Sequence, residues 1–371
     1  MLRMAVELRV LRRDDILLAA TSAGFSVMTE RRLEDFRRDG LMPRPVRVGN
    51  DGRRPVWIYP PGSDRQLVQL LRWRKHTSNV NVLRVVLWIE GFPLALDVVR
   101  ASATAVMDGL SHELEQLLQT EASSRDLDPA DDQDAVVDAV AETMAAKRGK
   151  DALPRPIRVP AGKRATAVAQ LLRIFALGTQ PNVTEDEAET VEKVLGVSPG
   201  RRHRVEDAGP WLTGPASVLV GAADFVSLPR MTEALTDATD TEWEEARSSA
   251  AAFFLQLPVF SRAVAAMTGN KNFAGMGGHT ALDSEPLMAV LLMAFVLGAR
   301  GADWFGNVED LAATLARWPT LVGEMKQVLD LPQAELDRNL AGLSHEMRAR
   351  TQRIIQALLD GELDTGPKPV R

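Results

Sequence analysis

The chain of 371 residues contains no cysteine and only one tyrosine. The lack of cysteine excludes disulfides, thiolate metal sites, iron–sulfur clusters and thiol nucleophiles. No apolar run approaches the roughly 20 residues that a membrane-spanning helix needs. The first apolar run is interrupted by charges, which makes it a poor signal peptide. We therefore expect a cytoplasmic protein without a membrane partner.

Catalytic and metal-binding patterns are also missing. The histidines lack the spacing of a metal-binding motif; they are His76, His112, His203, His279 and His345. Neither a nucleophile elbow nor a phosphate-binding loop is present. The glycine-rich residues 270–279 follow a helical pattern, so we interpret them as a loop, with a lid over a small-molecule pocket as the alternative. We expect no enzyme activity, no metal and no cofactor.

Positive charge is concentrated near the N-terminus, although the whole chain has a net charge of −6. Residues 1–80 contain 16 basic and 9 acidic residues, a net charge of +7. The remainder contains 28 basic and 41 acidic residues, a net charge of −13. This asymmetry predicts that the N-terminal segment faces a polyanion. A solvated arginine-rich surface is the alternative interpretation.

Helix-stop residues divide the N-terminal segment into short elements. Helices are predicted over 14–23 and from Thr29 to Gly40, each ended by a glycine. Thr29 can cap the second helix, because its side chain can accept a hydrogen bond from a free backbone amide. Leu33 and Phe36 are spaced to form the apolar inner face of this helix.

A β-hairpin and two further helices are predicted next. Residues 46–59 contain two strand-favouring runs around a turn at 49–52, where glycine, asparagine and aspartate tolerate positive φ. Ser63 or Asp64 can cap the following helix, and another helix is predicted over 79–91. The predicted order is helix, turn, helix, hairpin, helix, helix.

This order resembles the winged helix-turn-helix of the MerR family over residues 14–91. Leu33, Phe36 and residues 40–43 match the family's leucine, aromatic and Gly-Leu-Leu-Pro signature, with methionine in place of its second leucine. Thr29 falls where the family has a small capping residue. The resemblance implies a DNA-binding module followed by a helix through which family members dimerise.

The rest of the module matches the family less closely. Residues 52–54 with Tyr59 resemble the Gly-Tyr-Arg-x-Tyr wing, and residues 91–94 resemble a Gly-Phe-Ser-Leu turn. Pro-Val-Trp-Ile lengthens the wing before the tyrosine. Glu34 and Asp35 replace the family's Arg-Tyr pair, and carboxylates in a DNA groove repel phosphate.

Basic residues in this module are the candidate DNA contacts. Two arginines lie in the first turn of the predicted recognition helix, where bases are usually reached. Others flank the hairpin or follow it and are suited to contact phosphate or the minor groove. A solvated surface charge is an equally good interpretation for any single arginine, so the prediction rests on the cluster. The candidates are Arg31, Arg32, Arg38, Arg44, Arg47, Arg53, Arg54, Tyr59, Arg72, Arg74 and Lys75.

The segment 93–120 is predicted to be a helix with an apolar stripe. Val106, Leu110, Leu114 and Leu117 recur every three or four residues along it. The stripe either packs on its own domain or pairs with a second copy of the chain. We therefore expect a possible dimerisation helix here.

The remaining sequence is predicted to be a linker region and a helical body. Residues 121–160 are acidic and turn-rich, with one short helix over 135–146. Residues 1–92 are the predicted DNA-binding module, and residues 161–371, after the linker region, are the predicted effector or partner-binding domain. Its predicted helices are 163–177, 184–195, 216–238, 241–267, 285–298, 307–317, 319–330 and 333–360. The expected fold class is mainly α, with a hairpin wing in the N-terminal module and an all-helical C-terminal body.

These patterns favour a transcriptional regulator that binds double-stranded operator DNA. The expected partners are DNA, a second copy of the chain, and a small-molecule or protein effector. The alternative is an interaction protein that uses the winged fold for docking, an interpretation supported by Glu34 and Asp35. A helical enzyme has no residues in its favour.

Overall fold

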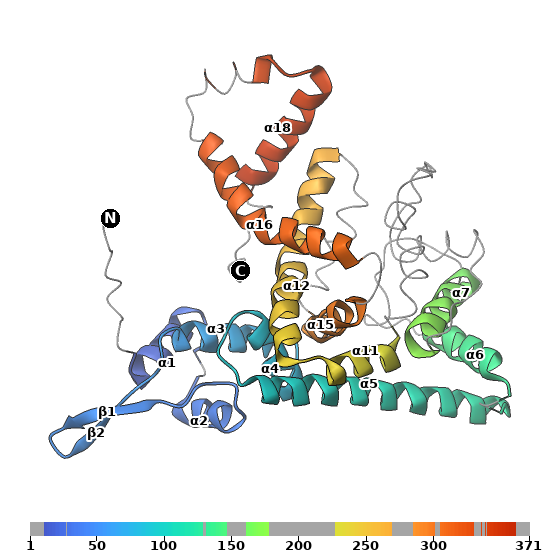
Figure 1. Cartoon of the computed structure of the whole chain (residues 1–371), viewed down its shortest axis with the longest axis horizontal. Helices are drawn as coiled ribbons and strands as arrows, with labels where there is room; N and C mark the ends of the chain where they lie inside the picture. The colour runs from blue at the N-terminus through green and yellow to red at the C-terminus, as the bar shows by residue number, and fades with distance from the viewer. Residues whose placement is uncertain are drawn as a thin grey trace. The chain divides into compact units, whose positions relative to one another are not determined.

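A computed structural model of the chain shows a mainly helical protein with one two-stranded antiparallel sheet (Figure 1). The chain divides into two compact units, residues 1–106 with 284–290 and residues 107–283 with 291–371. The mainly α fold class is confirmed at this level. The structure describes residues 11–26, 28–128, 131–146, 161–177, 227–268, 285–300, 305–329, 335, 338 and 340–360.

The first unit begins with the two predicted short helices. Helix α1 spans Arg13–Ser22 and α2 spans Glu30–Arg38. After α2, Gly40 has a φ of +69°, and its amide donates to the Arg37 carbonyl at 3.1 Å. The Leu41 amide reaches back to the Phe36 carbonyl at 2.8 Å. This is a Schellman ending, which favours glycine because other side chains are strained at positive φ.

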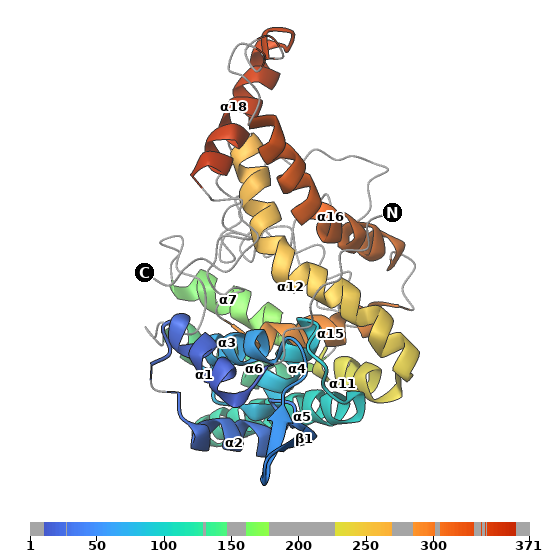
Figure 2. The same cartoon turned by 90° about the vertical axis from the view of Figure 1, so that its left-hand side faces the viewer.

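The hairpin is confirmed, but its turn is shorter than the sequence predicts. Strand β1 spans Val46–Asp51 and β2 spans Arg54–Ile58. Asp51 pairs with Arg54, so the turn lies at 52–53 instead of 49–52. A register shift between Arg47 and Gly49 allows the strand to continue past Gly49. The hairpin extends away from the helices of this unit (Figures 1 and 2).

Two helices complete the core of the first unit. Helix α3 spans Ser63–Trp73 and packs on α1, and α4 spans Val80–Ile89. The predicted cap at Ser63 or Asp64 is wrong, because the cap residue is Gly62, which has a φ of +85°. Ser63 is the first helical residue, and its hydroxyl donates to the Pro60 carbonyl at 2.7 Å. Asn79 caps α4 by accepting from two backbone amides.

Helix α5 spans Leu96–Arg125 and contains the predicted apolar stripe. Val106 in the stripe is buried, whereas Leu110, Leu114 and Leu117 are partly buried. The helix also includes the first residues of the predicted linker region.

The short helix predicted inside the linker region is confirmed as α6, Gln133–Ala146. It packs on α7, Ala161–Leu172, which continues into a π-helix, η1, over Arg173–Leu177. Their shared cluster is Val137, Ala141, Val168 and Ala169, with Leu118, Met144 and Leu172 against it. Helix α6 is therefore part of a packed core rather than a loose connection. The predicted linker residues 147–160 lie outside the described residues.

Helices α11 and α12 span Leu228–Asp237 and Asp240–Thr268. Helix α12 begins one residue before the predicted helix 241–267, and Thr239 caps it. The Thr239 hydroxyl accepts from the Glu242 amide at 3.3 Å, while the Glu242 carboxylate accepts from the Thr239 amide at 2.8 Å. This reciprocal capping box fixes the start of α12.

Helix α15 spans Leu287–Ala299, α16 spans Phe305–Leu329 and α18 spans His345–Leu359. The two helices predicted over 307–317 and 319–330 are wrong, since both ranges belong to the single helix α16, with Pro319 inside it. The single helix predicted over 333–360 is also wrong, because a turn at 342–343 precedes α18 and Ser344 caps it.

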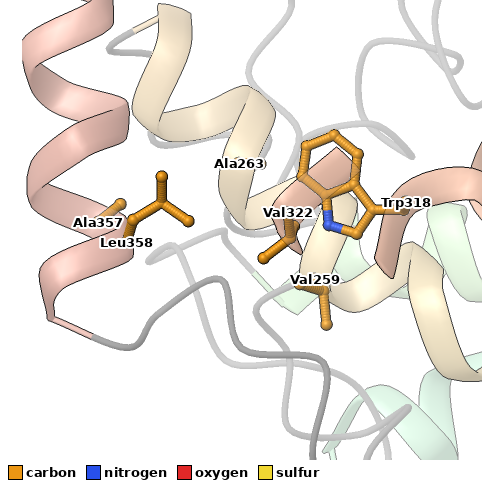
Figure 3. Packing of buried hydrophobic residues seen from close by; sticks show 6 residues of the cluster. All are labelled: Val259, Ala263, Trp318, Val322, Ala357 and Leu358. Atoms are coloured by element: carbon orange, nitrogen blue, oxygen red, sulfur yellow. The ribbon is translucent and has the colours of Figure 1, made fainter. Parts of the chain in front are cut away.

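A hydrophobic cluster joins α12, α16 and α18 in the second unit. Figure 3 shows the buried side chains, which are Val259, Ala263, Trp318, Val322, Ala357 and Leu358. Packing on both sides of Pro319 explains why α16 continues through it, since burial offsets one lost backbone hydrogen bond. The predicted helix 184–195, residues 216–226 of another, and the loop 270–279 lie outside the described residues.

Candidate nucleic-acid interface

Helix α2 is held against the first unit by its apolar face. Leu33 and Phe36 are buried, and the Thr29 hydroxyl accepts from the Arg32 amide at 3.3 Å, as predicted. At about 100° per residue, Arg31 lies roughly opposite Leu33, and Arg32 lies on the flank of the helix. Both side chains are exposed. The burial of one face therefore directs Arg31 outward.

The acidic residues of α2 are all in ion pairs. Glu30 pairs with Arg13 of α1 at 2.8 Å, and Asp35 pairs with Arg38 at 2.9 Å. Glu34 pairs with Arg37 one turn later. Exposed pairs add little stability, but they cancel charge locally. The predicted repulsion between Glu34, Asp35 and phosphate is thus reduced by arginines on the same helix.

Arg31 and Arg32 differ from the other arginines of α2. Within the described part of the chain, their side chains form no hydrogen bond or ion pair. They lie at the helix N-terminus, where the backbone dipole also favours an anion. The N-terminal end of α2 is therefore exposed and carries two cationic side chains that are not neutralised by an ion pair within the described residues.

The hairpin supplies a second group of exposed arginines. Arg44, Arg47, Arg53 and Arg54 are all exposed. The Arg47 guanidinium donates to the Asn50 side chain at 2.7 Å, whereas the other three form no such bond within the described residues. Figures 1 and 2 place α2 next to the base of the hairpin. The structure therefore brings two predicted groups of basic residues together on one unit.

The basic residues after α3 are partly engaged within the protein. Arg72 donates to Gln69 at 2.8 Å and is partly buried. The Arg74 guanidinium lies over the Phe36 ring at 5.9 Å, and this residue also donates to the Ser78 carbonyl at 3.3 Å. These contacts make Arg72 and Arg74 less available for phosphate than the arginines of the hairpin.

Lys75 and Arg38 are exposed but already have partners. The Lys75 ammonium lies 5.0 Å from the centroid of the Phe25 ring. Arg38 is paired with Asp35 and lies 3.8 Å from Asp39. Either side chain reaches phosphate only by sharing or leaving these contacts.

The position of Tyr59 argues against its predicted contact with DNA. Tyr59 is buried, with a relative solvent exposure of 4%. Its backbone amide donates to the Leu11 carbonyl at 2.8 Å. Burial raises the pKa of the Tyr59 hydroxyl, while Arg37 and Arg13 oppose this shift. Tyr59 therefore belongs to the core at the base of the hairpin.

Sequence reasoning missed Arg84, which positions α2. This arginine on α4 donates from Nε and Nη2 to the Asp39 carbonyl at 3.0 and 2.7 Å. Its Nη1 also lies 3.2 Å from Asn81 and 3.3 Å from the Ser102 hydroxyl. Arg84 is the single charged residue within the apolar run of α4, and a charge in such a run needs a partner. This feature of the sequence could have indicated its role.

A second polar network joins α3 to the end of α4. Gln69 Nε2 and Trp73 Nε1 donate to Glu90 Oε1 at 2.9 and 3.0 Å. Burial raises the pKa of Glu90, although these bonds and the nearby Arg72 oppose the shift. Gln66 Nε2 also donates to the Leu41 carbonyl at 2.8 Å in the interior. These bonds fix the helices behind α2.

The described residues contain no cluster of three or more side chains suited to hold a metal ion. None of the described helices has the length and apolar character needed to cross a bilayer. Comparison with known proteins finds no matching family model, curated protein or solved structure.

Proposed function

We propose that the first unit is a winged helix-turn-helix module that binds double-stranded DNA. The observation that carries this proposal is the charge distribution on α2, where acidic side chains are paired and Arg31 and Arg32 are not. A helix fits the major groove of B-DNA, and residues at its N-terminus reach bases. Arg31 and Arg32 are therefore the proposed base-reading residues.

The β1–β2 hairpin serves as the wing in this proposal. Arg44, Arg53 and Arg54 are exposed and contribute positive charge next to α2. Contacts from such residues to phosphate carry no base information but fix the orientation of the module. The proposed contacts of Arg38, Arg47, Arg72, Arg74 and Lys75 are secondary, because each already has a partner within the protein.

The proposed role is that of a cytoplasmic transcriptional regulator without enzyme activity, metal or cofactor. The second unit then senses a small molecule or binds a protein partner. The described part of this unit is helical, and the sequence outside residues 1–80 has a net charge of −13. An acidic body does not compete with the basic module for DNA phosphate.

A homodimer is part of the same proposal. Leu110, Leu114 and Leu117 stay partly exposed along α5, so apolar surface is available to a second copy. Leu118 packs against the α6–α7 cluster, so the chain itself covers the neighbouring surface. A monomer mass in solution at micromolar concentration contradicts this part of the proposal.

A docking module for another protein remains the alternative. In the sequence, the acidic residues Glu34 and Asp35 favoured a docking module. In the structure, both carboxylates are paired with arginines of α2. The two functions differ in how the chain responds to polyanions. A DNA-binding module prefers duplex DNA to other polyanions, whereas the arginines of a docking module are a solvated basic surface that binds any polyanion equally.

The test is an equilibrium binding titration of the full chain with mixed-sequence duplex DNA at several salt concentrations. We expect affinity to fall by several orders of magnitude between about 50 and 200 mM salt if six or more phosphates are contacted. Heparin and single-stranded DNA of equal charge are the controls. No duplex affinity at low salt, or equal affinity for heparin, overturns the proposal.

A further inference from the structure

Trp57 on β2 is exposed, unlike the other tryptophans that the structure describes. Its relative solvent exposure is 49%, whereas that of each of the others is 8% or less; these are Trp73, Trp88, Trp243 and Trp318. Leaving a large apolar ring in water is unfavourable, so a contiguous exposed apolar surface often marks a binding site. Val48 on the neighbouring strand β1 is also exposed, at 53%.

The register of the hairpin shows what shares a face with Trp57. Trp57 pairs with Arg47, and Pro55 pairs with Asn50. Residues directly opposite each other in an antiparallel pair project to the same side. The hydrogen bond of 2.7 Å from Arg47 to Asn50 agrees with this assignment. We call this side, with Arg47, Asn50, Pro55 and Trp57, the tryptophan face.

The opposite side of the hairpin has a different character. Val46 pairs with Ile58 and Gly49 pairs with Val56 there, and these two partners on β2 are partly buried. Trp57 therefore points away from the side on which β2 is covered. Because a two-stranded ribbon has no core of its own, this ring gains no packing from the hairpin.

The charge around the tryptophan face favours a polyanion as its occupant. Residues 44–58 contain four arginines and one aspartate, a net charge of +3. Arg47 lies on the face itself, and Arg53 lies in the turn at the tip of the hairpin. Arg54, also near the tip, pairs with Asp51 on the opposite side. An apolar protein partner needs no such charge, whereas phosphates line both edges of a DNA groove.

We propose that the tryptophan face lies over the minor groove and that Trp57 is a wedge that unstacks one base step. This inference rests on the proposed DNA binding and adds to it a residue that deforms the duplex. Apolar side chains inserted from the minor groove partly unstack base steps and bend DNA. Arg47 and the tip arginines would then hold the adjacent phosphates. Pyrimidine–purine steps are the expected targets, because they unstack most easily.

The experiment compares Trp57→Ala with Val46→Ala in the full chain. Val46 is 57% exposed and lies on the other side of the same hairpin, so its removal is a matched control. The duplex is selected from a random library by the wild-type chain and carries 2-aminopurine at its pyrimidine–purine steps. Affinity, 2-aminopurine fluorescence and DNA bending by energy transfer are measured together. Thermal unfolding confirms that both variants fold.

We expect the wild-type chain and Val46→Ala to raise 2-aminopurine fluorescence and bend the duplex. Trp57→Ala should lose both signals and bind on the order of tenfold more weakly, the loss typical of one aromatic contact with a base. Trp57→Phe should keep part of the bend. The tryptophan fluorescence of Trp57→Phe, subtracted from that of the wild-type chain, gives the fluorescence of Trp57 alone. The bound duplex should shield this fluorescence from a soluble quencher.

The failures of the two proposals are distinguishable. If the wild-type chain selects no duplex, DNA binding itself is wrong and the wedge is wrong with it. If it binds but 2-aminopurine stays stacked, or Trp57→Ala matches Val46→Ala, the wedge is wrong and DNA binding stands. Loss of another protein's binding in Trp57→Ala, with duplex binding unchanged, also overturns the wedge.

Discussion

The guanidinium of Arg84 on α4 donates two hydrogen bonds to the Asp39 carbonyl at the end of α2, at 3.0 and 2.7 Å. The last carbonyls of a helix lack partners within it, and their dipole favours a cation. Arg84 satisfies one of them from 45 residues away in the chain. The orientation of α2 thus depends on a residue that we do not expect to contact DNA.

Replacing Arg84 by alanine should loosen α2 from the first unit. We expect a loss of about 2 kcal/mol in the unfolding free energy of this unit, because charged hydrogen bonds to a partly buried carbonyl are removed. Hydrogen exchange of the α2 amides measures the change locally. Arg65→Ala is the control, since Arg65 is also an arginine of this unit and is exposed. Equal exchange in both variants contradicts the positioning role.

The pKa of Glu90 predicts how the stability of the first unit depends on pH. Burial raises this pKa in the folded chain, so the folded chain holds the proton more tightly than the unfolded chain. The free energy of unfolding should therefore fall as the pH rises from the unfolded to the folded pKa of Glu90. Glu90→Gln keeps an oxygen acceptor for Gln69 and Trp73 but cannot ionise.

Urea unfolding of both proteins between pH 4 and pH 8 tests this prediction, with the window set by the usual pKa of glutamate. The stability of the wild-type chain relative to Glu90→Gln should decrease as the pH rises. A difference that stays constant, or that grows in favour of the wild-type chain, contradicts the raised pKa.

Trp318 should stabilise the second unit through its ring rather than its N–H group. The ring lies edge-on to Phe260, with centroids 5.2 Å apart, and the buried indole Nε1 has no hydrogen-bond partner among the residues that the structure describes. Trp318→Ala should cost about 3–5 kcal/mol, whereas Trp318→Phe should cost roughly 1–2 kcal/mol because it keeps an aromatic ring. Hydrogen exchange in α12, α16 and α18 reports both losses. Equal losses would contradict stabilisation through the aromatic ring, because phenylalanine keeps a ring and alanine does not.

The stripe on α5 predicts the mass of the chain in solution. We expect a dimer at micromolar concentration and a shift to monomer in Leu114→Glu, because a charge cannot be buried unpaired at an apolar interface. Gln119→Glu adds the same charge at an exposed position of the same helix. Sedimentation equilibrium measures the mass, and circular dichroism checks the helix content. A monomeric wild-type chain rules out the dimer.

Local signals predicted the elements of the first unit well. Thr29 is a cap as expected, and glycines end α1, α2 and α4 as expected. These features depend on neighbouring residues alone, which makes them readable from sequence. The position of the hairpin turn was missed, because the register shift between Arg47 and Gly49 depends on how two strands pair.

Tertiary packing explains the other errors. Two helices were predicted over 307–317 and 319–330, but they form one helix, because Trp318 and Val322 are buried on either side of Pro319. At the candidate site, exposure of the arginines was predictable from their positions, whereas the roles of Arg84 and Tyr59 were not. Arg84 binds a carbonyl far away in sequence, and Tyr59 is covered through its bridge to Leu11.

The most direct measurement is the binding of the full chain to a selected duplex as a function of salt, before and after Arg31→Ala with Arg32→Ala. We predict that this pair abolishes the preference over scrambled duplex, because each lost base contact costs about 1–3 kcal/mol of discrimination. Arg53→Ala with Arg54→Ala should weaken both duplexes evenly and lower the salt slope by about 2, because these residues are the proposed phosphate contacts. Arg230→Ala with Arg317→Ala removes two exposed charges from the second unit and should change neither property. Unchanged sequence preference without Arg31 and Arg32 would contradict DNA reading by α2.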